Sequence, residues 1–86
     1  MYVWNHDGVK IFSTMGVEAK DNTVVVKGTG VQETSLPSTI PFAFTAISTH
    51  QGWYVEIETG SGRRGSMQGG TYNLPLEVAA SARRIL

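Results

Sequence analysis

The sequence predicts a mainly β domain, a small curled antiparallel sheet or partly open barrel of about six to seven strands with one C-terminal α-helix. Short runs of Val, Ile, Thr and aromatic residues alternate with polar residues, as strands do. Gly, Asn and Asp separate these runs, as turns do, and helical periodicity begins only after residue 73. Because 86 residues support one hydrophobic core, we expect residues 1–86 to form a single domain.

The first two strands are predicted to form a hairpin. The segments from Tyr2 to His6 and from Val9 to Thr14 flank Asp7-Gly8, a pair that favours the type I′ turn because both central residues of that turn have positive φ. This turn would place Trp4 opposite Ile11 on one face of the hairpin.

A second hairpin and a long loop are expected next. Segments 17–20 and 23–27 flank Asp21-Asn22, a second pair of turn residues. Gly16 marks either a bend within one long strand or a break between two strands. Stretch 28–41 holds two glycines, two prolines and several Ser and Thr residues, so we expect a loop of about ten residues there.

The third hairpin is predicted to form the centre of the core. His50-Gln51-Gly52 separates strands expected at 42–49 and 53–59. Alternation places the apolar residues of both strands on one shared face. These residues are Phe42, Phe44, Ala46, Trp53, Val55 and Ile57. Glu56 and Glu58 are then expected to point to solvent.

The last third is predicted to hold a weak edge strand and the single helix. Five of the eleven residues from Gly60 to Gly70 are glycine, which indicates a loop followed by a weak edge strand. The helix is expected from Pro75 to Leu86, with Val78 and Ala82 on its apolar face and Asn73 as its N-cap.

A meander of strands that ends in one helix resembles the order of elements in pleckstrin-homology domains. The resemblance rests on this order, from the hairpin at Asp7-Gly8 to the helix at 75–86, and it implies a barrel across which the helix packs. A cold-shock or SH3-like barrel with an added helix is the alternative architecture. Neither architecture determines a function by itself.

The formal net charge is zero, but the two signs are separated along the chain. Residues 1–59 carry three lysines against six acidic residues, a net of −3, whereas residues 60–86 carry four arginines against one glutamate, a net of +3. The arginines form the adjacent pairs 63–64 and 83–84. The second pair would oppose the negative end of the helix dipole, which explains it without a ligand.

Arg63 and Arg64, with Gly62 and Gly65, form the candidate anion-binding site. Glycine amides can form an anion-binding nest, and guanidinium groups bind phosphate in a bidentate manner. The alternative is a solvated hairpin tip. Nucleic-acid binding is not favoured, because a sequence pI ≈ 6.7 is not the basic signature expected of such proteins.

The sequence predicts no enzyme, metal or cofactor. The chain has no cysteine, which excludes disulfides, Cys-ligated zinc and thiol catalysis. His6 and His50 fall at predicted hairpin tips, and no cluster of His, Asp and Glu has the spacing of a metal site. We interpret Glu56 and Glu58 as solubilising charges. No catalytic residue is therefore assigned.

The composition also bears on localisation. The first residues lack the basic start and apolar stretch of a signal peptide, and the longest apolar-rich segment, from Ile40 to Ile47, is too short to cross a membrane. The lack of cysteine fits a reducing compartment. We expect a cytoplasmic protein without membrane contact.

Eight aromatic residues are more than one small core is expected to hide, so we predict exposed aromatic contacts. Trp53, Tyr54, Phe42 and Pro37 are the candidate partner-binding residues. The predicted function is a non-catalytic binding or assembly module that acts through a protein partner or as a homo-oligomer, of the kind that suits a phage or mobile-element adaptor or inhibitor. The alternative is binding of a nucleic acid or small phosphorylated molecule by loop 60–70.

Overall fold

The described part of the chain forms seven strands and one helix. The computed structural model describes residues 2–6, 8–13, 17–20, 23–33, 39–70 and 73–86, and side chains within these ranges at 8–11 and from 23 onward. The elements are β1 (Tyr2–His6), β2 (Val9–Ser13), β3 (Val17–Lys20), β4 (Thr23–Glu33), β5 (Thr39–Thr49), β6 (Gly52–Thr59), β7 (Arg64–Gln68) and α1 (Leu74–Ile85). The prediction of a mainly β fold with one C-terminal helix is confirmed.

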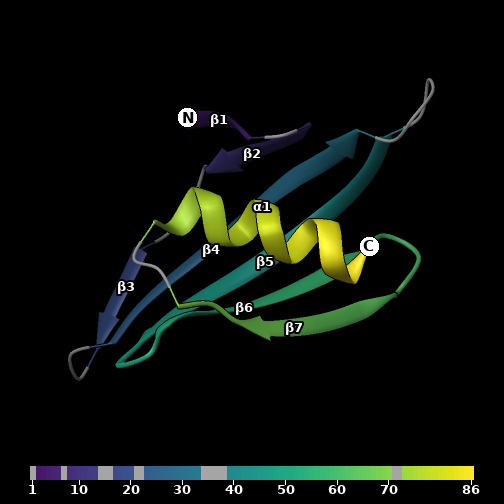
Figure 1. Cartoon of the computed structure of the whole chain (residues 1–86). Helices are drawn as coiled ribbons and strands as arrows, with labels where there is room; N and C mark the ends of the chain where they lie inside the picture. Colours follow the sequence, from purple (N-terminus) through teal and green to yellow (C-terminus); the bar gives the residue numbers. More distant parts are fainter. Residues whose placement is uncertain (1, 7, 14–16, 21–22, 34–38, 71–72) are drawn as a thin grey trace.

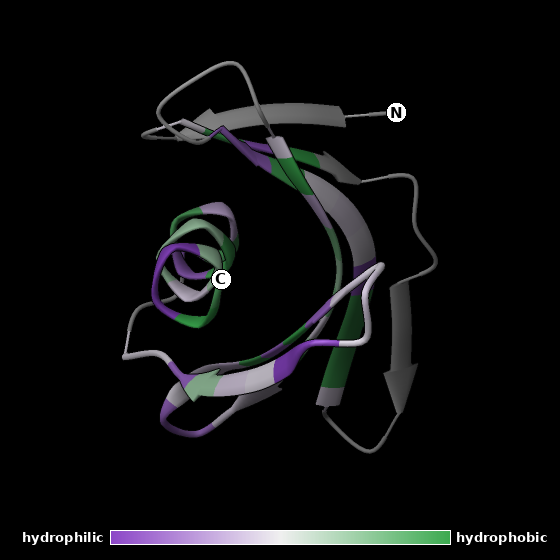
Figure 2. Ribbon diagram, turned by 90° about the vertical axis from the view of Figure 1, so that its right-hand side faces the viewer, coloured by the Kyte–Doolittle hydropathy of each residue, from purple (hydrophilic) through white to green (hydrophobic). Residues whose placement is uncertain are grey.

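All strands belong to one antiparallel sheet in the order β1-β2-β4-β5-β6-β7, with β3 also paired to β4 (Figure 1). The sheet curls around α1, which lies against its concave side (Figure 2). We call this side the inner face and the opposite side the outer face. The core lies between the inner face and α1, and its most buried apolar residues are Val9, Ile11, Val26, Phe42, Phe44, Ala46, Val55, Ile57, Val78, Ala79 and Ala82.

The first hairpin has the register that its turn residues predict. Trp4 pairs with Ile11, and Gly8 has φ 79°, while Asp7 lies outside the described residues. In the third hairpin Thr49 pairs with Gly52, which has φ 104°. Gly52 is therefore the first residue of β6, and the connection is shorter by one residue than predicted.

Two strands pair with β4 on the same side. β2 pairs with residues 29–32 of β4, and β3 pairs with residues 23–26. Lys20 pairs with Thr23, which fits the expected two-residue turn, although Asp21-Asn22 and Gly16 lie outside the described residues. β2 and β3 thus share one long neighbour, β4, and each pairs with a different part of it.

The loop predicted from residue 28 to 41 is wrong, because β4 continues to Glu33 and β5 begins at Thr39. Gly28 and Gly30 lie inside β4, where the phenyl rings of Phe44 and Phe42 cover them. A Cβ at Gly28 would overlap the Phe44 ring. These glycines are needed for close packing across the strands and do not mark a loop.

The helix begins and ends within one residue of the prediction. Asn73 Oδ1 accepts a hydrogen bond of 3.1 Å from the Leu76 N–H, which makes Asn73 the N-cap. Val78 and Ala82 are fully buried against the sheet, as the apolar stripe predicted. The edge strand is confirmed as β7, which pairs only with β6 among the strands described.

Candidate functional site

The outer face carries a row of apolar side chains in the middle of the sheet. Val25 pairs with Ile47, and Ile47 pairs with Tyr54, so the three residues lie side by side on β4, β5 and β6. Each is half-buried, although no helix covers this face in the described part of the chain. We call these three residues the apolar row. Side chains of this kind, placed away from the core, are available for contact with another molecule.

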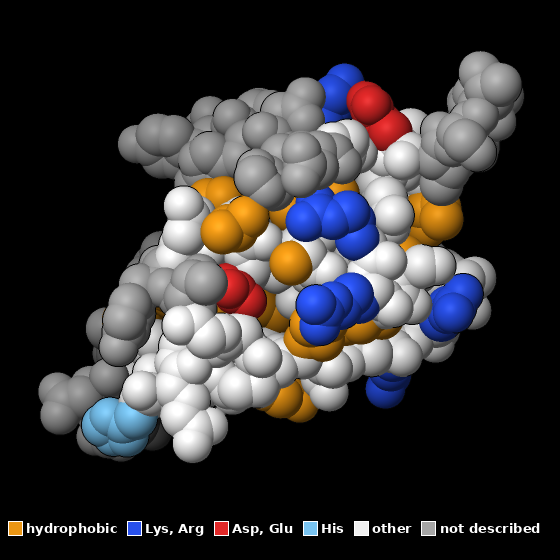
Figure 3. Space-filling view, in the orientation of Figure 1, with side chains coloured by type: hydrophobic (Ala, Val, Ile, Leu, Met, Phe, Trp, Pro, Cys, Tyr) orange, Lys and Arg blue, Asp and Glu red, His pale blue; other side chains and the backbone are white. Residues whose placement is uncertain are grey.

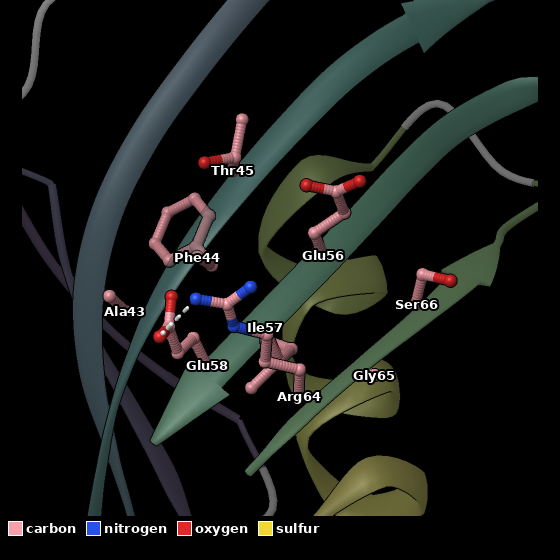
Figure 4. Close-up of a pocket in the computed structure, with 9 residues that line it drawn as sticks. All are labelled: Ala43, Phe44, Thr45, Glu56, Ile57, Glu58, Arg64, Gly65 and Ser66. Atoms are coloured by element: carbon pink, nitrogen blue, oxygen red, sulfur yellow. Dashed lines mark ion pairs between the residues drawn. The ribbon is translucent and has the colours of Figure 1, made fainter. Parts of the chain in front are cut away.

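A shallow groove of about 450 Å³ lies beside the apolar row. Its polar lining comes from cross-strand neighbours on β5, β6 and β7, namely Thr45, Glu56, Glu58, Arg64 and Ser66 (Figure 4). Arg64 Nη2 lies 3.1 Å from Glu58 Oε1, and both side chains are at least half exposed. The exposed pair contributes little to stability. The guanidinium of Arg64 offsets the charge of Glu58, one of the two carboxylates in the groove.

A second groove, of about 460 Å³, continues across the outer face to β4. Val31 and Pro41 pair across β4 and β5 at this position, and Ala43 joins the two grooves. The outer face therefore has apolar surface on both sides of the carboxylates of Glu56 and Glu58.

The candidate partner-binding residues divide between the two faces of the sheet. Tyr54 lies in the apolar row, but its neighbour Trp53 is half-buried and packs against the core on the inner face. Neighbouring residues of a strand point to opposite faces, so the two rings cannot act together on one partner. Phe42 is 3% exposed and belongs to the core, which corrects its expected role as a contact. Pro37 lies outside the described residues.

None of the four aromatic rings that the structure describes is fully exposed. Phe42 and Phe44 are buried, and Trp53 and Tyr54 are half-buried. The two phenyl rings fit because Gly28 and Gly30 leave space for them, so the core accommodates more aromatic surface than the size of the chain indicated.

The turn between β6 and β7 does not form an open anion nest. The Gly62 N–H donates to the Thr59 carbonyl (3.0 Å), and the Arg63 N–H donates to Thr59 Oγ1 (3.1 Å). Gly65 belongs to β7, and the side chain of Ile85 fills the space over it. The expected nest of Gly62 and Gly65 is therefore corrected, because these amides and this space are already used by the fold.

The arginine side chains divide between the two faces of the sheet. Arg64, at the start of β7, points to the outer face and pairs with Glu58, whereas Gly65 faces Ile85 of α1. Arg63 lies in the β6–β7 turn, and Arg83 and Arg84 lie in the last turn of α1; all three are exposed. Lys and Arg side chains lie over α1 and along the adjoining sheet edge in Figure 3. We call Arg63, Arg83 and Arg84 the arginine end.

Among the described side chains, His50 and the carboxylates of β6 do not form a cluster that could bind a metal. Among the described residues no group of three or more His, Cys, Asp or Glu could hold a metal ion. His50 is exposed in the β5–β6 turn, whereas Glu56 lies in the middle of β6. No helix in the described part of the chain has the length and apolar character needed to cross a membrane.

Sequence reasoning missed Val25 and Ile47 as surface residues. The signal was the run Val24-Val25-Val26, because three successive apolar residues in a strand place apolar surface on both faces. Comparison of the chain with protein-family models, with curated proteins and with solved structures finds no match.

Proposed function

We propose that the protein is a non-catalytic assembly module of the cytoplasm that associates with a second copy of itself through the outer face. The apolar row is the observation that carries this proposal. Val25, Ile47 and Tyr54 form a continuous strip over three strands, on the side of the sheet opposite α1. Burying such a strip against another sheet removes apolar surface from water.

The architecture favours sheet-on-sheet packing as the mode of association. Two sheets can pack face to face about 10 Å apart, with interdigitated side chains. In an isologous dimer the apolar row of one copy would contact that of the other, so one patch would serve both subunits. The polar groove of Glu56, Glu58 and Arg64 would lie at the rim, where ion pairs remain hydrated.

Native mass spectrometry over a range of protein concentrations tests the proposal. We expect masses at multiples of 9.3 kDa whose abundance rises with concentration. Tyr54→Asp should leave the monomer, because it places a charge in the apolar row. Ile47→Thr with Tyr54→Thr keeps high strand propensity and should have the same effect in a folded protein.

The matched control is Ala80→Asp. Ala80 is half-buried on α1, on the other side of the sheet, so this variant adds the same charge away from the outer face. It should assemble as the unmodified protein does. Self-association through the outer face would be refuted if the unmodified protein were a monomer at every concentration. It would also be refuted if Ala80→Asp and Tyr54→Asp lost the oligomer to the same extent.

A further inference from the structure

The arginine end is a strongly charged surface that self-association does not use. Its three cations, Arg63, Arg83 and Arg84, are exposed, whereas Arg64 lines the outer groove and pairs with Glu58. Segment 60–86 has a net charge of +3, and its single acidic residue, Glu77, is 8% exposed. The zero net charge of the chain therefore hides a local excess of positive charge at the surface.

Packing of α1 on β7 holds the last turn of the helix close to the turn that carries Arg63. A Cβ at Gly65 would overlap Ile85 Cγ2 and would lie 3.0 Å from Ile85 Cγ1. Gly65 lies two residues after Arg63 in the chain, and Ile85 follows Arg84. The contact thus fixes the last turn of α1, with Arg83 and Arg84, against the start of β7.

We propose that the arginine end binds the phosphodiester backbone of a nucleic acid. Each guanidinium group can donate two parallel hydrogen bonds to one phosphate. The three cations come from a turn and from the last turn of a helix, and an extended polyanion that lies across the surface can contact all of them.

The choice of arginine favours nucleic acid over an anionic membrane. Attraction to a lipid surface is long-range and similar for Lys and Arg. Segment 60–86 contains four arginines and no lysine, which fits directed, bidentate contacts to phosphate.

Fluorescence anisotropy with a labelled single-stranded DNA and with its duplex tests the proposal. Three phosphate contacts on a single strand give a slope of about −2.1 in log affinity against log salt. Affinity should then fall about 18-fold between about 50 and 200 mM salt. Arg83→Gln with Arg84→Gln should reduce the slope to about −0.7, so the same change in salt lowers affinity only about 3-fold.

The matched control is Lys10→Gln with Lys27→Gln. It removes the same charge from residues that face the outer side of β2 and β4, away from the arginine end. Its affinity and salt slope should equal those of the unmodified protein, and circular dichroism should show that both double variants are folded. An equal loss of DNA affinity in the arginine and lysine double variants would overturn the proposal.

Two further results would also overturn it. One is the absence of DNA binding at about 50 mM salt, where three contacts should be easiest to detect. The other is binding to phosphatidylserine vesicles without binding to either DNA. Native mass spectrometry at the protein concentrations used for anisotropy reports the copy number of each variant. A loss of DNA binding can therefore be distinguished from a loss of self-association.

Discussion

Gly28→Ala should destabilise the protein because the ring of Phe44 occupies the space that a Cβ needs. The new Cβ would overlap Phe44 Cε1 and Cζ and would lie 3.1 Å from Cδ1. Phe44 is 2% exposed, so its ring has no free space into which it can turn. Overpacking of this kind costs about 1–3 kcal/mol, while replacing a strand glycine by alanine elsewhere gains about 0.5–1 kcal/mol.

The net effect is a loss of about 1–2 kcal/mol of unfolding free energy, and Phe44→Leu should relieve it. Leucine lacks the Cε1 and Cζ atoms that the Cβ would overlap and keeps only the contact near 3.1 Å. In the Phe44→Leu background, Gly28→Ala should therefore cost less than about 0.5 kcal/mol. The double-mutant cycle then has a coupling free energy of about 1 kcal/mol.

Urea unfolding followed by circular dichroism measures these changes. With a denaturant dependence of about 1 kcal/mol per molar, Gly28→Ala should lower the midpoint by about 1–2 M. Gly60→Ala is the control, because no atom lies within 4 Å of a Cβ at Gly60, and its effect should stay within about 0.5 kcal/mol. Equal midpoints for the two alanine variants, or no relief by Phe44→Leu, would show that the ring does not cover Gly28.

The helix offers two more tests of the packing argument. Ser81 is 1% exposed, and its Oγ has no hydrogen-bond partner among the described residues. Ser81→Ala should therefore raise the unfolding free energy by about 1–2 kcal/mol in the same urea assay. A lower unfolding free energy would show that the hydroxyl has a hydrogen-bond partner. Asn73→Ala removes the N-cap hydrogen bond to Leu76 and should lower the unfolding free energy by about 1 kcal/mol, which corresponds to a fall of about 4–8 °C in Tm. Asn73→Asp should retain most of the stability, because aspartate also caps helices. Equal Tm values for the two variants would contradict the capping role.

Local signals were sufficient for the hairpins and the helix. Gly8 and Gly52 have positive φ, which few other residues adopt, so the turns could be identified from one or two residues. Alternation then placed Phe44 and Ile57 on the same face, and the register confirms that they pair. These elements depend on neighbours within a few residues along the chain.

Long-range contacts determine what the sequence did not predict. Gly28 and Gly30 were interpreted as loop residues because nothing near them in the sequence shows that the rings of Phe44 and Phe42 will cover them. The position of the arginine end likewise depends on Ile85 packing on Gly65, twenty residues earlier in the chain. A cross-strand or helix–sheet contact of this kind has no local pattern.

The two proposed surfaces can be occupied at the same time. Tyr54 of the apolar row points to the outer face, whereas Arg83 and Arg84 lie on α1, which packs on the inner face. A dimer formed through the apolar rows would therefore carry two arginine ends, and a nucleic acid long enough to reach both would bind with an affinity that exceeds that of one end through effective concentration. Self-association would then strengthen nucleic-acid binding without any additional contact to phosphate.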